Sequence, residues 1–162
     1  MNEPQTKDRK SKGANVRFPP PLVLLIALVS SGLLQRFVHG TIPTGRALGL
    51  GLGSGLILIA VGLLAWSSGL FRKTGQDLRP WVTTPELIIE GVYRFTRNPM
   101  YLGMALVQTG TGLMLRSPWF LALLPVTMIA IFLIAIRPEE RYLQQKFGDA
   151  YLDYKRRTRR WL

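Results

Sequence analysis

Residues 91–103 have the sequence Gly91-Val92-Tyr93-Arg94-Phe95-Thr96-Arg97-Asn98-Pro99-Met100-Tyr101-Leu102-Gly103. This polar, turn-forming stretch passes into an apolar one at Asn98-Pro99. Asparagine is a favoured helix N-cap because its side-chain oxygen accepts a backbone N–H of the first turn. Proline is favoured at the first helical position, where its missing N–H costs nothing. The sequence therefore predicts a helix that begins at Pro99 and is capped by Asn98.

The start of this helix is a candidate anion site, because free N–H groups and a partial positive charge gather there. Tyr93, Arg97 and Tyr101 surround the same point. An equally simple interpretation is an ordinary capped helix at a membrane surface, with its arginines facing lipid headgroups. The rest of the chain decides between the two interpretations.

The composition points to a membrane protein. The 162 residues suit one domain, and they are 48% hydrophobic yet carry 21 Lys and Arg against 9 Asp and Glu. The charges avoid several long apolar runs and crowd the segments between them, which is the membrane pattern and not that of a nucleic-acid reader. With no Cys and one His, the chain has no thiol nucleophile and no multi-histidine metal site, so we expect no metal.

We predict an all-α integral membrane protein with about four transmembrane helices. A disordered basic tail, 1–18, precedes a single membrane domain, 19–162. The predicted spans are 21–38, 47–66, 99–115 and 118–136. They are followed by an interfacial C-terminal helix, 138–157, which Gly148-Asp149 interrupts, and by a basic cluster that suits anionic headgroups.

The positive-inside rule orients these spans. Five Lys and Arg lie in the tail, 5 between the second and third spans and 8 after the fourth, against 3 on the other side. Both termini are therefore predicted to be cytoplasmic. Residues 91–101 and 137–140 then flank the hairpin of the third and fourth spans on that same side, so they can meet.

Two GxxxG pairs, Gly49/Gly53 and Gly51/Gly55, mark the second predicted span. Small residues at this spacing let helix backbones approach closely. The pattern suits packing within one chain as well as dimerisation, so the oligomeric state stays open.

The two converging segments carry complementary chemistry. Residues 91–101 supply a helix start, Arg97 and tyrosine faces that can stabilise a cation. Residues 137–140 supply Arg137, Glu139 and Glu140. Together they match a zwitterionic ligand with a cationic centre at the membrane boundary.

Three motifs in order resemble the isoprenylcysteine carboxyl methyltransferase family and its phospholipid methyltransferase relatives, across residues 66–162. They are Gly91-Val92-Tyr93 with Arg97-Asn98-Pro99-Met100-Tyr101, then Glu139-Glu140, then Phe147-Gly148-Asp149-Ala150-Tyr151-Leu152-Asp153-Tyr154. The resemblance implies a membrane enzyme that uses S-adenosylmethionine without a Rossmann domain.

The resemblance also implies site residues. Cofactor binding is implied for Leu87, Ile88, Tyr93, Asn98, Pro99, Met100, Tyr101 and a glutamate of the pair Glu139-Glu140. We add Arg97, whose charge suits the carboxylate of the cofactor. The catalytic candidates are Glu140 and, through an imperfect alignment, Arg137 as the arginine that holds the substrate. Eukaryotic members have His where this chain has Asn98, so the chain resembles the prokaryotic branch, and a bacterial inner membrane is the expected location.

The expected function is methyl transfer from S-adenosylmethionine to a lipophilic, membrane-partitioned carboxylate or thiol at the cytoplasmic face. One alternative is N-methylation of phospholipid headgroup amines, which are present at the same boundary. Another is a non-catalytic membrane protein that binds a lipid or a partner, because Asn98 is not a base near neutral pH. A transporter would need charges deep in several spans, and the sequence has few.

Overall fold

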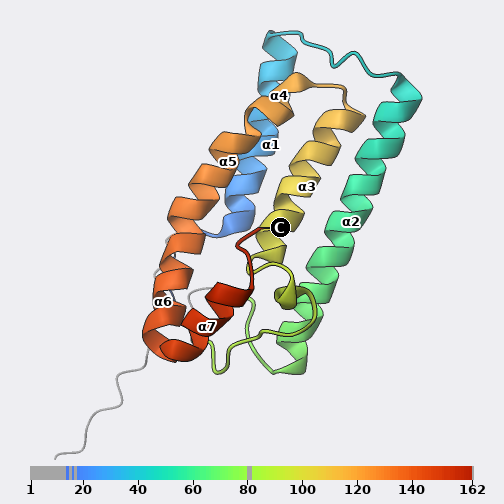
Figure 1. Cartoon of the computed structure of the whole chain (residues 1–162). Coiled ribbons are helices and arrows are strands. Elements are labelled where there is room, and N and C mark those ends of the chain that lie inside the picture. The colour runs from blue at the N-terminus through green and yellow to red at the C-terminus, as the bar shows by residue number, and fades with distance from the viewer. Residues whose placement is uncertain (1–13, 15, 17, 80–81, 162) are drawn as a thin grey trace, which may run out of the picture.

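The computed structural model describes residues 14, 16, 18–79 and 82–161 (Figure 1). The described elements are α1 (Pro20–Phe37), α2 (Arg46–Lys73), the 3-10 turn η1 (Gly91–Arg94), α3 (Pro99–Met114), α4 (Pro118–Ala122), α5 (Leu124–Ile131), the π turn η2 (Phe132–Ile136), α6 (Arg137–Phe147) and α7 (Asp149–Arg157). Within this part of the chain the only extended pairing is an isolated bridge between Thr96 and Arg159. The predicted all-α class is confirmed.

The long helices stand side by side in an elongated bundle (Figure 1). Prolines in the first two positions begin α1, α3, α4, α5 and α6, where a missing N–H costs no hydrogen bond. Along the shaft, apolar side chains such as Ile26, Leu58 and Ile129 are more than half exposed. An apolar surface of this extent is typical of a membrane-contacting protein.

Three helical segments of the described chain are long and apolar enough to cross a membrane: Pro20–Phe37, Arg46–Lys73 and Pro118–Phe147. The last of these joins α4, α5, η2 and α6 into one rod. The predicted span 99–115 corresponds to α3, whose 16 residues make it about 24 Å long. Because a bilayer core is about 30 Å thick, a fourth crossing stays a prediction.

Glycines bring the backbones of α2 and α3 into contact. A Cβ added at Gly53 would lie 2.5 Å from the carbonyl oxygen of Gly110, and one added at Gly110 would lie 2.7 Å from that of Gly53. Gly49 approaches the carbonyl oxygen of Leu113 in the same way, at 2.8 Å. A Cβ at Gly51 or Gly55 would meet no described atom within 4 Å. Only the first of the two predicted pairs therefore packs within the chain.

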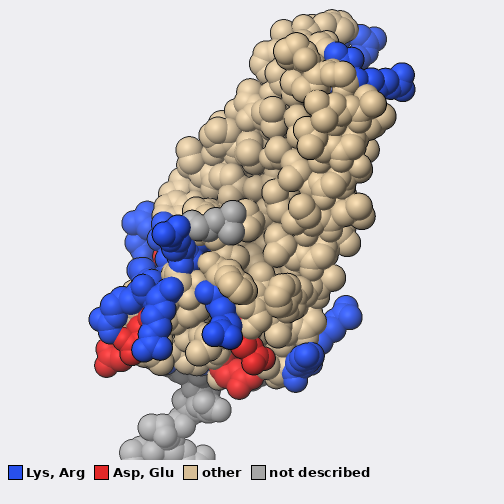
Figure 2. All heavy atoms as spheres, turned by 45° about the vertical axis from the view of Figure 1, so that its right-hand side comes forward, with Lys and Arg blue, Asp and Glu red and all other residues tan. Residues whose placement is uncertain are grey.

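Charged side chains gather at the two ends of the bundle and leave the shaft between them apolar (Figure 2). The end that holds α6 and α7 also holds the loop after α2, η1 and the start of α3 (Figure 1). Residues 91–101 and 137–140 thus lie at the same end, as their predicted common side requires.

The predicted cap of α3 is wrong, although the helix begins at Pro99 as expected. The Asn98 side chain makes no capping hydrogen bond. Its Nδ2 instead donates to the carbonyl oxygen of Arg160 at 3.1 Å. The Asn98 side chain therefore binds the C-terminal segment 158–161 and does not cap the helix that it precedes.

The predicted C-terminal helix 138–157 consists of two helices. Gly148, with φ of +52°, lies between α6 and α7 and adopts a backbone conformation that glycine tolerates best. The break turns α7 back toward η1, where the Tyr154 hydroxyl donates to the carbonyl oxygen of Tyr93 at 2.7 Å.

The predicted disordered tail, 1–18, lies largely outside the described residues. Two of its described members, Ala14 and Val16, are buried in a cluster with Tyr101 and Ile131. This segment therefore contacts the bundle next to the start of α3.

The two faces of α2 predict opposite effects for the same substitution. Gly53→Ala should destabilise the protein by about 1–3 kcal/mol, because the new methyl group overlaps the α3 backbone. Gly55→Ala should be neutral or stabilising by up to about 1 kcal/mol, because alanine favours a helix and the position is open. Thermal unfolding of the detergent-purified variants measures both, and equal effects would contradict the observed α2–α3 contact.

Candidate functional site

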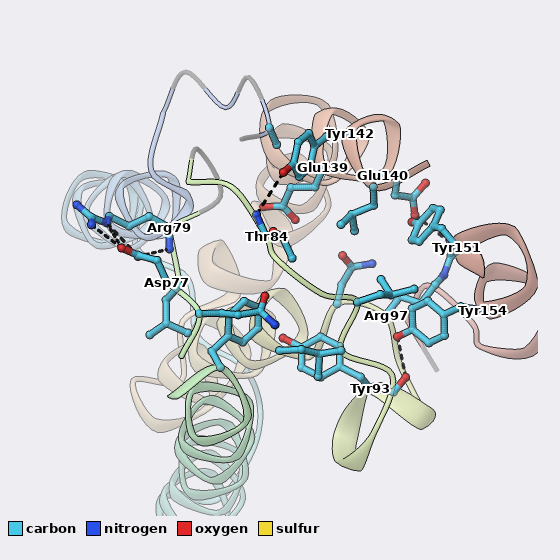
Figure 3. Close-up of a pocket in the computed structure, with 18 residues that line it drawn as sticks. Asp77, Arg79, Thr84, Tyr93, Arg97, Glu139, Glu140, Tyr142, Tyr151 and Tyr154 are labelled. Atoms are coloured by element: carbon cyan, nitrogen blue, oxygen red, sulfur yellow. Dashed lines mark hydrogen bonds and ion pairs between the residues drawn. The ribbon is translucent and has the colours of Figure 1, made fainter. Parts of the chain in front are cut away.

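A pocket opens at the end of the bundle that holds α6 and α7 (Figure 3). It contains about 780 Å³ of space, including the part open to solvent. Figure 3 shows Arg97, Tyr151 and Tyr154 on one side and Asp77 and Arg79 on the opposite side. The lining residues are Ala14, Phe71, Gln76, Asp77, Leu78, Arg79, Thr84, Leu87, Ile88, Tyr93, Arg97, Asn98, Glu139, Glu140, Tyr142, Leu143, Tyr151 and Tyr154.

Arg97 supplies a buried positive charge to the pocket. Its side chain is 8% exposed, and its Nη1 lies 3.4 Å from Glu140 Oε1. Neither Nε nor Nη1 has a hydrogen-bond partner in the described structure. Buried guanidinium nitrogens without partners are costly and uncommon, so this group suits an anionic ligand.

The two adjacent glutamates have different partners. Glu140 accepts hydrogen bonds from Nε and Nη2 of Arg160, both at 3.0 Å. Glu139 Oε1 accepts the Tyr101 hydroxyl at 2.5 Å, and no ion pair to Glu139 occurs among the described residues. Glu140 is thus paired with an arginine within the protein, whereas Glu139 has a hydrogen bond but no ion-pair partner among the described residues.

Another part of the pocket wall consists of apolar side chains and one amide. Phe71, Leu87 and Ile88 line it, and the rings of Phe71 and Tyr93 lie 6.1 Å apart between centroids. Gln76 is buried, and neither its Oε1 nor its Nε2 has a hydrogen-bond partner in the described structure. A free amide beside apolar walls can bind the donor and acceptor edge of a heterocycle.

Tyr93 and Tyr151 stay protonated in the pocket. Burial raises the pKa of Tyr151 to about 12, and the nearby Arg97 and Arg160 charges only partly oppose this. Burial also raises the pKa of Tyr93 above its ordinary value, and the Glu139 charge adds to that rise. Near neutral pH these phenols form neutral aromatic walls and do not act as bases.

The C-terminal segment 158–161 fixes the Arg97 turn from outside. The Arg97 backbone N–H donates to the Arg159 carbonyl oxygen at 3.0 Å. The Thr96 hydroxyl donates to the Arg160 carbonyl oxygen at 3.1 Å. Backbone contacts of this kind carry no sequence pattern, which explains why the sequence does not identify residues 158–161 as part of the site.

The structure brings seven of the predicted site residues to the pocket wall: Leu87, Ile88, Tyr93, Arg97, Asn98, Glu139 and Glu140. Tyr101 lies behind the wall and acts on it through Glu139. Pro99 and Met100 do not line the pocket, and Arg137 is exposed at the start of α6. The sequence missed Gln76, Tyr151, Tyr154 and Arg160, because burial and pairing, not residue type, distinguish them.

These groups suit an elongated ligand with a zwitterionic end. Arg97 faces its anionic group, Glu139 its cationic group, and the Gln76 side of the pocket takes an apolar or heterocyclic part.

Comparison with known proteins places the chain in a protein family. The family model described as phospholipid methyltransferase matches residues 48–150, a range that holds every lining residue except Ala14, Tyr151 and Tyr154. No solved structure gives a significant match.

Several curated methyltransferases are similar to part of the chain. Protein-S-isoprenylcysteine O-methyltransferase B of Arabidopsis thaliana is 38% identical over 73 residues, 45% of this chain and 37% of the relative. The Mus musculus protein-S-isoprenylcysteine O-methyltransferase is 36% identical over 110 residues, which are 65% of this chain and 38% of the relative. Methanethiol S-methyltransferase 1 of Bradyrhizobium diazoefficiens is 35% identical over 90 residues, which are 56% of this chain and 30% of the relative.

The matched segments span only about a third of the length of these relatives. The family itself is shown, because its model covers more than half of the chain and includes the turn at Arg97 and both glutamates. The chain belongs to the phospholipid methyltransferase and isoprenylcysteine O-methyltransferase family.

Proposed function

We propose that this protein transfers a methyl group from S-adenosylmethionine to a lipophilic, membrane-partitioned carboxylate or thiol at the cytoplasmic face. The observation that carries the proposal is the pairing of unsatisfied groups in one pocket. Arg97 is buried beside Glu140 with two nitrogens that lack hydrogen-bond partners, and Glu139 has no ion-pair partner among the described residues. S-adenosylmethionine presents the complementary carboxylate and ammonium groups.

The remaining lining residues also fit this cofactor. The unpartnered Gln76 amide and the apolar side chains of Phe71 and Ile88 suit its adenine ring. The Tyr93 face suits its sulfonium centre through cation–π attraction. Asn98, Leu87 and Glu140 complete the wall, and Tyr101 holds Glu139 from outside it.

When bound, the cofactor supplies a methyl group that an acceptor takes by in-line displacement while the sulfur–carbon electron pair returns to sulfur. The protein's own work is alignment and exclusion of water. Arg97 and Glu139 fix one end of the ligand and the Gln76 side fixes the other. Such orientation is worth up to roughly 7–11 kcal/mol in well-aligned systems.

An acceptor that arrives ionised matches the site best. The lining contains no histidine among the described residues, and the phenols of Tyr93 and Tyr151 have raised pKa values. A carboxylate or thiolate needs no general base. Arg137, exposed at the start of α6, is our candidate for contact with an acceptor carboxylate that approaches from the membrane boundary.

Phospholipid headgroup amines are the second candidate acceptor, in line with the description of the matching family model.

The bundle supports a location in the membrane. Three apolar helices are long enough to cross it, and the basic cluster after α6 would contact anionic headgroups at the cytoplasmic face. We propose a bacterial inner membrane protein with both termini cytoplasmic.

Binding of S-adenosylmethionine to the detergent-purified protein, measured by calorimetry, tests the cofactor site. Arg97→Gln and Glu139→Gln should each weaken binding by about tenfold or more, because each removes a charge-assisted contact worth about 1.4 kcal/mol or more. Glu86→Gln, which removes a charge from an exposed side chain, should bind like the native protein. No binding by folded native protein would overturn the proposal.

Tyr101→Phe separates the hydroxyl from the ring. The variant keeps the buried ring but loses the hydrogen bond that holds Glu139, so cofactor affinity should fall by about three- to tenfold while thermal stability changes little. Unchanged affinity in a stable Tyr101→Phe protein would show that Tyr101 does not position Glu139.

The acceptor class is tested with labelled S-adenosylmethionine and three probes: a long-chain thiol, a long-chain carboxylate with a neighbouring thioether, and phosphatidylethanolamine vesicles. We expect label in the thiol or carboxylate and little in the phospholipid, with Arg97→Gln abolishing transfer. Label found mainly in the phospholipid would replace the first acceptor class by the second.

A further inference from the structure

Two arginines approach one carboxylate at the inner end of the pocket. Arg160 donates from Nε to Glu140 Oε1 and from Nη2 to Oε2, both at 3.0 Å. Arg97 Nη1 lies 3.4 Å from the same Oε1, without hydrogen-bond geometry. Glu140 is therefore committed to Arg160, and its contact with Arg97 is secondary.

Arg160 is itself held in place on three sides. Its carbonyl oxygen accepts hydrogen bonds from the side chains of Thr96 and Asn98, both at 3.1 Å. Its guanidinium carbon lies 5.0 Å from the centre of the Phe132 ring, within cation–π range. The fork that grips Glu140 is thus preorganised by η2 and by the Arg97 turn.

Without Arg160, we expect Glu140 to pair with Arg97 instead. Its side chain is 15% exposed, and a buried carboxylate without a cation is strongly disfavoured. Arg97, 8% exposed, is the cation within reach. A small rotation would convert the 3.4 Å contact into a bidentate pair and would occupy the nitrogens that are now unpartnered.

We propose that Arg160 is a positioning residue that keeps Arg97 available for the carboxylate of the methyl donor by holding Glu140 in a bidentate pair. The inference rests on the proposed function of the pocket. Arg160 satisfies Glu140, Arg97 keeps nitrogens without hydrogen-bond partners, and Glu139 has no ion pair among the described residues. That arrangement is complementary to an amino-acid zwitterion, whereas a Glu140–Arg97 pair would leave no cation for its carboxylate.

The test compares binding of S-adenosylmethionine with that of its decarboxylated analogue, which lacks only the carboxylate. Arg160→Gln should weaken binding of S-adenosylmethionine by about tenfold or more and should leave the affinity for the analogue nearly unchanged. Arg141→Gln removes an equal charge from an exposed side chain beside Glu140 and serves as the matched control, with native affinity for both ligands.

A second substitution tells positioning from general structural damage. In Arg160→Gln/Glu140→Gln the competing carboxylate is gone, so Arg97 is free again and the affinity for S-adenosylmethionine should recover at least fivefold over the single variant. If Arg160→Gln does not fold, Arg160→Lys, which keeps the charge but loses the fork, takes its place in the same comparison.

Two results would overturn the inference. One is native affinity for S-adenosylmethionine in folded Arg160→Gln. The other is an equal loss for both ligands with no recovery in the double variant. Failure of the native protein to bind either ligand would instead count against the proposed function, so the two failures are distinguishable.

Discussion

The site depends on hydrogen bonds between two segments that lie about sixty residues apart in sequence. Carbonyl oxygens of Arg159 and Arg160 accept from the Arg97 backbone, the Thr96 hydroxyl and the Asn98 amide. These bonds fix the turn that presents Arg97, and they carry the Arg160 guanidinium to Glu140. The C-terminal segment therefore sets both the geometry and the charge of the pocket, while the membrane bundle supplies the rigid base on which the segment closes.

The sequence predicted the helical class, the start of α3 and seven of the eighteen residues that line the pocket, because those features follow from local residue patterns. Apolar runs and first-turn prolines define helices without reference to the rest of the fold. The Asn98 cap failed for the opposite reason. A local rule assigned the Asn98 side chain to the helix N-terminus, but the side chain hydrogen-bonds to the distant carbonyl oxygen of Arg160 instead.

Roles that depend on pairing were not readable from the sequence. Glu139 and Glu140 are adjacent and chemically identical, yet one is bound to Tyr101 and the other to two arginines. Gln76 lies in a polar loop and gives no signal until folding buries it without partners. Residue type predicted which groups gather at the membrane boundary, and only the structure shows which of their charges remain unused.

The π turn η2 joins the apolar rod of α4 and α5 to α6, which carries both glutamates. A π turn has more residues per turn than an α-helix, so it offsets the rotational phase of α6 from that of the rod without breaking the backbone connection. The carboxylates are then mechanically linked to a segment embedded in lipid. Pro118–Phe147 is one continuous segment, so the placement of both carboxylates beside Arg97 follows from how the apolar rod packs in the bundle.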